Sequence, residues 1–467
     1  MAISLLDKVV RRLKNFNNSA SDPLAGGGND IFDPYIRSRS IPASAPLCLA
    51  PWTSISFNID GGATVCCLNK KTTVYIGDGS IDDIWKSKEF ELLRKNIAEK
   101  NLEYDCSACH GQILAGNHIG AKAADYNHYF PHNPERPRFM EFCLENTCNL
   151  ACKMCTSLLS STIRNKEKLP PLKKHYDERF VTQLEPYIPH LKEVAFAGGE
   201  PFLIPIYYQI WEKMLDLNPD LIIGVVTNGS VLNERIKAML NRGRFLINMS
   251  IDSTHKETYE AIRRNASFDN LMENFNWFRE YGIRKNLPIN MPVCPLTDNW
   301  HTIPQTVRFA NQHDVALNFV YVYRPFSMAL SYCKPEYLEN IVQQFSREEF
   351  ESVSPRAADN VKRFKGLTDE IRKWRDANLQ LQEVVVENDL MQALQSRIAV
   401  WTKAKDASAQ QEMMLKVTEL FNAIPEKNHE IFIRLLSGYP AERLGEFLET
   451  KNSREITVFF RELVGAE

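Results

Sequence analysis

The pattern of hydrophobic and polar positions predicts alternating strands and helices in the middle of the chain. Short apolar stretches recur between amphipathic helical sequences, and the expected strands are Phe139–Leu144, Glu193–Ala197, Ile222–Thr227, Leu246–Ile251, Ile289–Val293 and Ala316–Tyr323. Such alternation predicts a parallel sheet, and its curled form is an open (β/α)6 barrel. In these α/β folds the chemistry lies at the carboxyl ends of the strands.

Three other stretches surround this region. Residues 1–47 form an expected loose tail, in which the amphipathic stretch Ser4–Phe16 docks on the protein itself or touches a membrane surface or partner. Residues 48–137 carry cysteines and an alternating stretch that ends in the turn at Asp60, typical of a β-hairpin, and then a helical stretch Ile81–Ala98. Residues 334–467 follow the barrel region at 138–333 and show only helical periods, including Asn360–Leu379 and Gln410–Ile424.

Composition narrows the class of protein. The 56 Lys plus Arg residues nearly balance the 58 Asp plus Glu residues, giving a formal net charge of −2. The chain therefore has no overall positive charge that would attract nucleic acid. No apolar run approaches the roughly 18 residues of a membrane span, and no signal peptide is evident, so we expect a cytoplasmic protein. In that compartment the 11 cysteines are expected to be reduced metal ligands rather than disulfides.

The central motif is a group of three cysteines, Cys148, Cys152 and Cys155, directly after the first expected barrel strand. Three thiolates on one short loop can each bind one corner of an iron–sulfur cube and leave the fourth iron open for chemistry. A structural zinc ion, the alternative, normally takes four ligands, and no fourth Cys or His follows nearby.

A second motif, Gly198-Gly199-Glu200-Pro201, follows the second expected strand. Adjacent glycines permit close backbone approach, and the glutamate with exposed carbonyl groups can accept hydrogen bonds from an ammonium group. The alternative is an ordinary turn before a helix.

Together the two motifs resemble the radical S-adenosylmethionine (SAM) superfamily, and the resemblance covers roughly residues 138–331. It implies a partial (β/α)6 TIM-like barrel, a [4Fe–4S] cluster on the three cysteines, and SAM bound to the open iron. It also implies that Gly198, Gly199, Glu200 and Pro201 hold the methionine end of SAM. The cluster then cleaves SAM to a 5′-deoxyadenosyl radical, which abstracts hydrogen from a substrate.

The resemblance extends to other strand ends. Ser250 becomes a candidate for the ribose, Asn228 and Asp252 are expected close by, and Arg263 is expected to reach the SAM carboxylate. Without the resemblance these are ordinary turn, cap or surface residues. Met154 precedes the last cysteine of the triad, where the family often has an aromatic residue, and its thioether can still pack on adenine.

The amino-terminal cysteines form a second group. Cys48 is followed by 12 residues, Gly61, four residues and Cys66, and a later pair, Cys106 and Cys109, is separated by two residues. The spacing resembles SPASM and Twitch modules, which hold an auxiliary cluster, although those modules usually follow the barrel. Cys67 could replace Cys66, His110 could intrude, and zinc remains an alternative.

Three cysteines remain outside these groups. Cys143 is expected to be a buried free thiol. Cys294 follows the fifth strand and Cys333 follows the sixth, so one of them is a candidate to donate a hydrogen atom to a substrate radical or to bind the auxiliary cluster.

The leading hypothesis for function is modification of a ribosomally made peptide or a protein side chain, by cross-linking, epimerisation or oxidation. This follows from the resemblance to SPASM enzymes. The alternatives are a radical dehydrogenase or epimerase of a sugar or amino acid, and a metal-binding scaffold without radical chemistry. The basic stretch Arg164–His175 is a solvated loop or a guide for an acidic peptide or a flavodoxin or ferredoxin-type electron donor.

Overall fold

The structure is a computed structural model that describes residues 31–385, except positions 70, 78, 115, 117, 119, 131–134 and 326. It also describes the single positions 411, 415, 418, 419, 421 and 422. The expected helix at residues 4–16 and most of that at 410–424 lie outside the described residues. The chain divides into two compact units. Unit 1 comprises residues 1–148, 170–226 and 233–246, and unit 2 comprises residues 149–169, 227–232 and 247–467.

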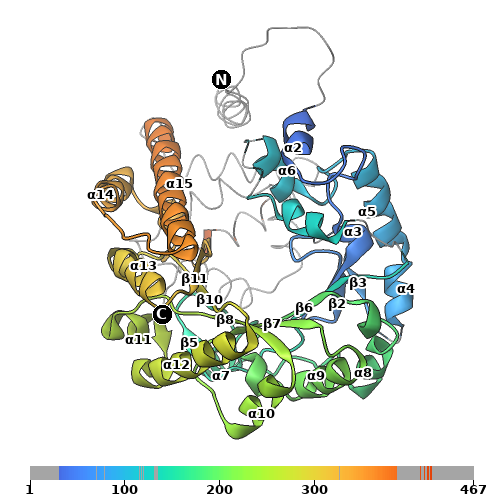
Figure 1. The fold of residues 1–467 in the computed structure, drawn as a ribbon. Coiled ribbons are helices and arrows are strands. Elements are labelled where there is room, and N and C mark those ends of the chain that lie inside the picture. Colours follow the sequence, from blue (N-terminus) through green and yellow to red (C-terminus); the bar gives the residue numbers. More distant parts are fainter. Residues whose placement is uncertain are drawn as a thin grey trace. The chain divides into compact units, whose positions relative to one another are not determined.

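Unit 1 contains strands in the order β7-β6-β4-β1-β2-β3 (Figure 1). Neighbours among β7, β6, β4 and β1 run parallel, whereas β1, β2 and β3 pair antiparallel. The bounds are β1 Ser54–Phe57, β2 Gly62–Thr64, β3 Val74–Tyr75, β4 Phe139–Phe142, β6 Glu193–Phe196 and β7 Ile222–Thr227.

The predicted hairpin in the cysteine-bearing stretch is confirmed. Gly61 has a φ of +82°, which favours glycine, and the Asp60 carboxylate accepts a hydrogen bond of 2.9 Å from the Gly62 N–H. The sequence did not predict that β1 pairs in parallel with β4, so that the hairpin continues the sheet of the first barrel strand.

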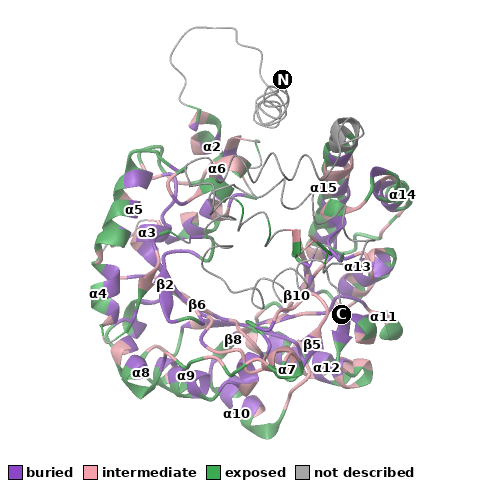
Figure 2. Cartoon of the chain, turned by 180° about the vertical axis from the view of Figure 1, so that it is seen from behind, coloured by how far each residue is buried: buried purple, intermediate pink, exposed green. Residues whose placement is uncertain are grey.

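One face of this sheet carries the buried apolar side chains that form the core of unit 1. The side chains of Phe142 and Phe196 stack with ring centroids 4.7 Å apart. Figure 2 shows buried residues along these strands, and those that face the core are Ile55, Phe57, Met140, Phe142, Val194, Phe196, Ile223 and Val225. All of β1 is buried, whereas on β4 and β6 buried residues alternate with half-buried ones. This period of two is what a half-buried strand requires.

Helices flank the strands of unit 1, and α8 and α9 lie side by side. The bounds are α2 Asp33–Ser38, α3 Ala50–Thr53, α4 Ile81–Trp85, α5 Lys88–Ala98, α6 Ser107–Leu114, η1 Lys122–Tyr129, α8 Glu178–Leu184, η2 Ile188–His190, η3 Pro201–Leu203, α9 Pro205–Leu217 and α10 Glu234–Arg242. The helix expected at residues 81–98 is two helices, because Ser87 caps α5 through the Phe90 N–H.

Unit 2 contains the parallel strands β10 Asn290–Val293 and β11 Ala316–Phe319 with the end of β8 Arg244–Met249, and a small antiparallel pair, β5 Ala151–Cys152 and β9 Arg263–Arg264. Its other elements are α7 Ser161–Lys166, α11 Lys256–Ile262, α12 Phe268–Lys285, η4 Trp300–Thr302, α13 Ile303–Gln312, η5 Leu330–Tyr332, α14 Pro335–Phe345 and α15 Pro355–Val385.

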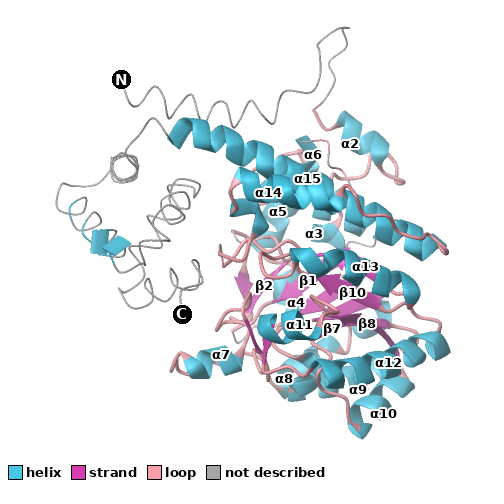
Figure 3. Ribbon diagram, turned by 90° about the vertical axis from the view of Figure 1, so that its left-hand side faces the viewer, coloured by secondary structure: helices cyan, strands magenta, loops and turns pink. Residues whose placement is uncertain are grey.

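The long helix α15 contains the predicted helical stretch at residues 360–379 and packs along α14 (Figure 3). It is attached to β11 through Asn360, whose side-chain oxygen accepts from the Leu317 N–H at 2.8 Å and whose amide donates to the Val315 carbonyl at 3.0 Å. One buried amide thereby satisfies two backbone groups at the edge of the sheet.

The predicted fold class, α/β with a parallel sheet, is confirmed, and all six expected barrel strands are present. The fourth begins two residues earlier than expected, because Phe245 and Ile247 already alternate as buried residues. The sixth ends at Phe319 rather than Tyr323.

Candidate functional site

The glycine pair of unit 1 lies against the segment that leads to Cys148. A Cβ atom on Gly199 would lie 2.3 Å from the Thr147 carbonyl oxygen, and one on Gly198 would lie 2.7 Å from the Glu145 carbonyl oxygen. The Gly199 N–H donates to that Glu145 carbonyl at 3.0 Å, and the Glu200 N–H donates to Thr147 at 2.8 Å. No other residue permits this approach, since side-chain atoms never come so close to backbone.

Tyr207 fixes the two strand ends that carry these segments. Its buried hydroxyl group accepts from the Leu144 N–H at 2.9 Å and lies 2.8 Å from the Ala197 carbonyl oxygen as a donor. The Glu200 side chain is fully buried and accepts from the Phe202 N–H at 3.3 Å. Cys148 and the Gly-Gly-Glu-Pro motif are therefore held by one set of backbone contacts.

The other two cysteines of the triad belong to unit 2. Cys152 lies on β5, where it pairs with Arg263 of β9, and the Cys155 N–H closes a turn on the Cys152 carbonyl at 3.0 Å. The Lys153 N–H donates to the Ile262 carbonyl at 2.9 Å. The loop is thus supported by the end of α11.

A buried ion pair lies behind this loop. The Arg263 Nε atom donates to the Asp252 carboxylate at 2.8 Å, and the Asp252 side chain is fully buried. The second oxygen of the same carboxylate accepts from the Cys294 N–H at 2.9 Å. Although burial opposes its charge, Asp252 and the neighbouring Cys152 thiol raise the pKa of Arg263 above its ordinary value. Arg263 and Asp252 therefore bind each other, beside Cys152.

The remaining predicted SAM contacts are also in unit 2. Asn228 is buried. Its side-chain amide donates to the Asn149 side chain at 3.1 Å, and its side-chain oxygen accepts from the Ser230 N–H at 2.8 Å. The Ser250 N–H donates to the Thr227 carbonyl at 2.9 Å. Met154 packs, together with Cys294, on an apolar cluster of Ile262, Leu296 and Met328.

The two candidate thiols for hydrogen transfer have different surroundings. Burial and the Asp252 carboxylate raise the pKa of the Cys294 thiol, which also lies near Cys152. Burial alone raises the pKa of Cys333 to about 12, and its carbonyl group accepts from the Asn378 amide of α15 at 2.9 Å. Among the described residues, only Cys294 joins the group around Asp252.

Four cysteines from separate segments of unit 1 lie near enough to one another to affect the ionisation of their thiols. Burial raises the pKa of the Cys48 thiol, and the neighbouring thiols of Cys66, Cys106 and Cys109 raise it further, against a hydrogen bond of 3.4 Å from the Ala50 N–H. Burial and the thiol of Cys109 raise the pKa of Cys106 to about 12. Neighbouring thiols that oppose one another's ionisation are the donor set that a positively charged iron centre would stabilise.

Cys67 and His110, the other candidate ligands, have contacts of their own. A hydrogen bond from Cys67 lowers the pKa of Cys66 to about 7, whereas the pKa of Cys67 is raised by that bond and by burial. His110 lies 3.9 Å from the Glu103 carboxylate and packs against the Phe32 ring.

Asn69 joins the loops that carry Cys66 and Cys106. Its N–H donates to the Cys66 carbonyl at 3.0 Å, and its side-chain amide donates to the Asp105 carbonyl at 3.0 Å and to the Cys106 sulfur at 3.8 Å. The sequence offered no signal for Asn69, since its partners are 36 and 37 residues away. Hydrogen bonds to cysteine sulfur tune bound clusters.

The residues fit the groups that they would hold. By number and type, three thiols on one short loop suit a cube with one open iron, and four thiols suit a closed one. Across the residues that the structure describes, no three Cys, His, Asp or Glu side chains are grouped as closely as one metal ion requires. Within the same residues, no helix has the length and apolar character to cross a membrane.

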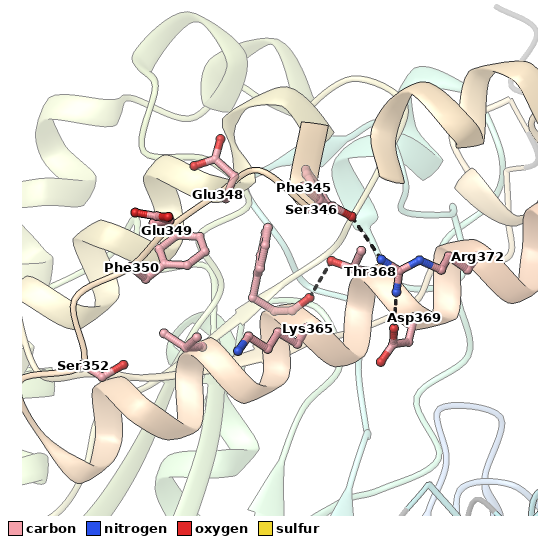
Figure 4. Close-up of a pocket in the computed structure, with 12 residues that line it drawn as sticks. Phe345, Ser346, Glu348, Glu349, Phe350, Ser352, Lys365, Thr368, Asp369 and Arg372 are labelled. Carbon is pink, nitrogen blue, oxygen red and sulfur yellow. Dashed lines mark hydrogen bonds and ion pairs between the residues drawn. The ribbon is translucent and has the colours of Figure 1, made fainter. Parts of the chain in front are cut away.

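A groove lies elsewhere in unit 2, between α15 and the segment after α14 (Figure 4). Its volume is about 670 Å³, and it is lined by Phe345, Phe350 and Phe364 together with charged residues such as Lys365 and Arg372. The Arg372 guanidinium group pairs with Asp369 across the exposed side of α15. None of the predicted site residues lines the groove.

Comparison with known protein families identifies the class. Residues 144–310 match the radical SAM superfamily, and residues 48–110 match the SPASM iron–sulfur cluster-binding domain. The chain therefore contains a radical SAM domain, as the three-cysteine loop and the Gly-Gly-Glu-Pro motif indicated.

More particularly, it carries the SPASM domain before the radical SAM domain, in the order that its cysteine spacing indicated. A radical SAM domain implies a [4Fe–4S] cluster and SAM, and a SPASM domain implies an additional iron–sulfur cluster.

Individual relatives are distant. The GTP 3′,8-cyclase of Listeria monocytogenes serotype 4b is 25% identical over 201 residues, which cover 43% of this chain and 58% of the relative. That of Streptomyces coelicolor is 27% identical over 183 residues, covering 38% and 50%. The chain thus spans between half and three fifths of the length of these relatives.

Solved structures show only remote similarity. The protein anSMEcpe with bound AdoMet is 18% identical with a TM-score of 0.36, covering 44% of this chain and 58% of that one. Streptococcus suis SuiB bound to S-adenosylmethionine is 12% identical with a TM-score of 0.34, covering 56% and 59%.

The buried pair of Asp252 and Arg263 predicts a large loss of stability in one variant. Asp252→Asn leaves the Arg263 cation buried without its counter-ion, so the free energy of unfolding should fall by about 3–5 kcal/mol. Chemical denaturation followed by circular dichroism measures it. Asp298→Asn is the matched control, because it breaks the partly exposed 2.8 Å pair with Lys153 and should cost only ~0–1 kcal/mol. Equal losses in the two variants would contradict the assignment.

Proposed function

We propose that this protein cleaves SAM reductively and abstracts a hydrogen atom from a residue of a ribosomally made peptide or from a protein side chain. The observation that carries the proposal is the match of residues 48–110, which include Cys48, Cys66, Cys106 and Cys109, to the SPASM domain, in a chain that also has the Cys148, Cys152 and Cys155 loop. A second, closed thiolate site is typical of SPASM enzymes, which often act on peptides. Cross-linking, epimerisation and oxidation all begin with the same hydrogen abstraction.

The residues of the radical site have distinct roles in this proposal. Cys148, Cys152 and Cys155 hold the cluster, and Glu200 with the backbone of Gly198 and Gly199 orients the amino group of SAM. When bound, the cluster and SAM supply the 5′-deoxyadenosyl radical that takes the substrate hydrogen. Ser250 and Asn228 are assigned to the ribose side and Met154 to adenine.

The structure changes the roles that we assign to two other residues. Arg263 and Asp252 are committed to each other, so we assign them to positioning the Cys152 segment rather than to direct contact with SAM. Cys294 keeps the role of candidate hydrogen donor, since it is the thiol beside that pair. Cys333 is retained only as a weaker candidate, because its described contacts are with its own loop and α15.

The proposed auxiliary ligands are Cys48, Cys66, Cys106 and Cys109. Cys66 is preferred to Cys67 because it is buried and its thiol, unlike that of Cys67, affects the ionisation of Cys48, Cys106 and Cys109. The alternative is a zinc ion at this site, and measuring the metal content of the protein distinguishes it from an iron–sulfur cluster.

An electron donor of the flavodoxin or ferredoxin type is the expected partner. Lys166 and Lys168 are exposed in the segment after the cysteine loop, where they would attract an acidic protein. We also retain the cytoplasmic location, since thiols stay reduced there.

The ligand assignment predicts different metal contents for two neighbouring variants. After anaerobic reconstitution, Cys66→Ser should lose about four irons per chain, because the cube lacks one of its four ligands. Cys67→Ser is the matched control and should keep the iron content of the wild type. Iron, sulfide and zinc are measured on the same samples. A loss confined to Cys67→Ser would overturn the ligand set, and zinc near one per chain in the wild type would make the site structural.

The reaction itself is tested by product formation. The reconstituted wild type with SAM and a strong reductant should yield 5′-deoxyadenosine, and Cys148→Ala should yield none, because its radical cluster cannot assemble. A protein digest of the native host should increase the yield more than free sugars, amino acids or GTP, the last chosen because of the cyclase relatives. Greater stimulation by a small metabolite would favour the alternative, a dehydrogenase or epimerase. Absence of 5′-deoxyadenosine under every condition would leave a metal-binding scaffold.

A further inference from the structure

The second face of the unit 1 sheet differs from its apolar core. Register partners in parallel strands point to the same face, and one row across the four strands is Ser56 of β1, Glu141 of β4, Ala195 of β6 and Gly224 of β7. Three of the four have small side chains or none. The Glu141 carboxylate is therefore the one long side chain in this row.

The two faces of the sheet also differ in how far their residues are buried on β4 and β6. The residues on either side of Glu141 along β4, Met140 and Phe142, are fully buried in the core, whereas Glu141 and Ala195 are only half-buried. Ser56 and Gly224 of the same row are buried, so Glu141 and Ala195 are the two positions of the row with surface left for contact with another molecule.

Among the residues that the structure describes, the hydrogen-bond partner of Glu141 is neutral. The Ser56 hydroxyl group donates to its carboxylate at 2.9 Å. Among the residues that the structure describes, no Lys, Arg or His side chain forms an ion pair with Glu141. A half-buried carboxylate without a cation is costly to the protein, and a bound cationic group would remove that cost.

The position of Glu141 links it to both candidate sites of unit 1. Two residues further along the same face, the Cys143 sulfur would lie 3.7 Å from a Cβ on Gly198 of the Gly-Gly-Glu-Pro motif. In the other direction, the Glu141 carboxylate contributes to raising the pKa of Cys67, after its bond to Cys66, burial and the Cys66 charge. Glu141 thus lies on the strand that leads to the proposed SAM clamp, near enough to Cys67 for the two side chains to interact electrostatically.

We propose that Glu141 binds an ammonium or guanidinium group of the substrate, so that the enzyme acts on or next to a lysine or arginine residue. The inference rests on the proposed function for the nature of the substrate. It adds a specificity-determining residue that lies outside both cysteine motifs. The contact is a charge-assisted hydrogen bond in a partly desolvated place, where such bonds are strongest.

The test uses glycine-flanked, end-blocked peptides that differ only in a central lysine, arginine, norleucine or glutamate. Binding to the reconstituted holoenzyme with SAM is measured by calorimetry. The wild type should bind the lysine and arginine peptides roughly tenfold or more tightly than the norleucine peptide. Glu141→Gln, which keeps the shape of the side chain, should abolish that preference, and Glu141→Asp should retain part of it.

Glu193→Gln is the matched control. Glu193 lies on the same face but already has partners, the Tyr129 hydroxyl at 3.4 Å and His128 at 3.8 Å, so its loss should leave the preference intact. Equal binding of the lysine and norleucine peptides by the wild type, or the same preference in Glu141→Gln, would overturn the inference. Because calorimetry does not require SAM cleavage, absence of 5′-deoxyadenosine would count against the proposed function and not against Glu141.

Discussion

The arrangement of the proposed radical site depends on the contact between a glycine pair and the backbone of another strand end. With a Cβ on Gly199 the nearest atom would be 2.3 Å away, so the contact exists only because the side chain is absent. The contact allows two backbone hydrogen bonds from the N–H groups of residues 199 and 200. The Tyr207 hydroxyl group forms hydrogen bonds with the same two strand ends. The positions of Cys148 and Glu200 both follow from this contact, although the two residues are 52 positions apart in the sequence.

The two faces of the unit 1 sheet have different roles in this account, one in stability and the other in the proposed chemistry. One face carries the stacked aromatic rings of Phe142 and Phe196 and provides the apolar burial that folding requires. The other carries small residues around Glu141. Since β1 continues this sheet, the hairpin that leads to Cys66 is attached by main-chain hydrogen bonds to the strand that leads to Cys148. The four-thiol set and the SAM clamp therefore belong to one compact unit.

Much of this could be predicted from the sequence, for reasons that differ between features. The six strands were predictable because their buried residues alternate with period two, and the cysteine groups because spacing alone signals them. The choice between Cys66 and Cys67 was not, since it depends on which of the two thiols lies near those of Cys48, Cys106 and Cys109. Arg263 was expected at SAM, but a sequence cannot show that Asp252, 11 residues earlier, binds it in the interior. Glu141 was missed because a single carboxylate in a strand has no motif, and only the register reveals the small residues around it.

The central claim is that the glycine contact builds the radical site without affecting the four-thiol site. Iron and acid-labile sulfide per chain in Gly199→Ala, measured after anaerobic reconstitution beside the wild type, test it most directly. The wild type should contain about eight irons and the variant about four, because only the cube near Cys148 loses its support. A variant that still holds about eight irons would contradict the account.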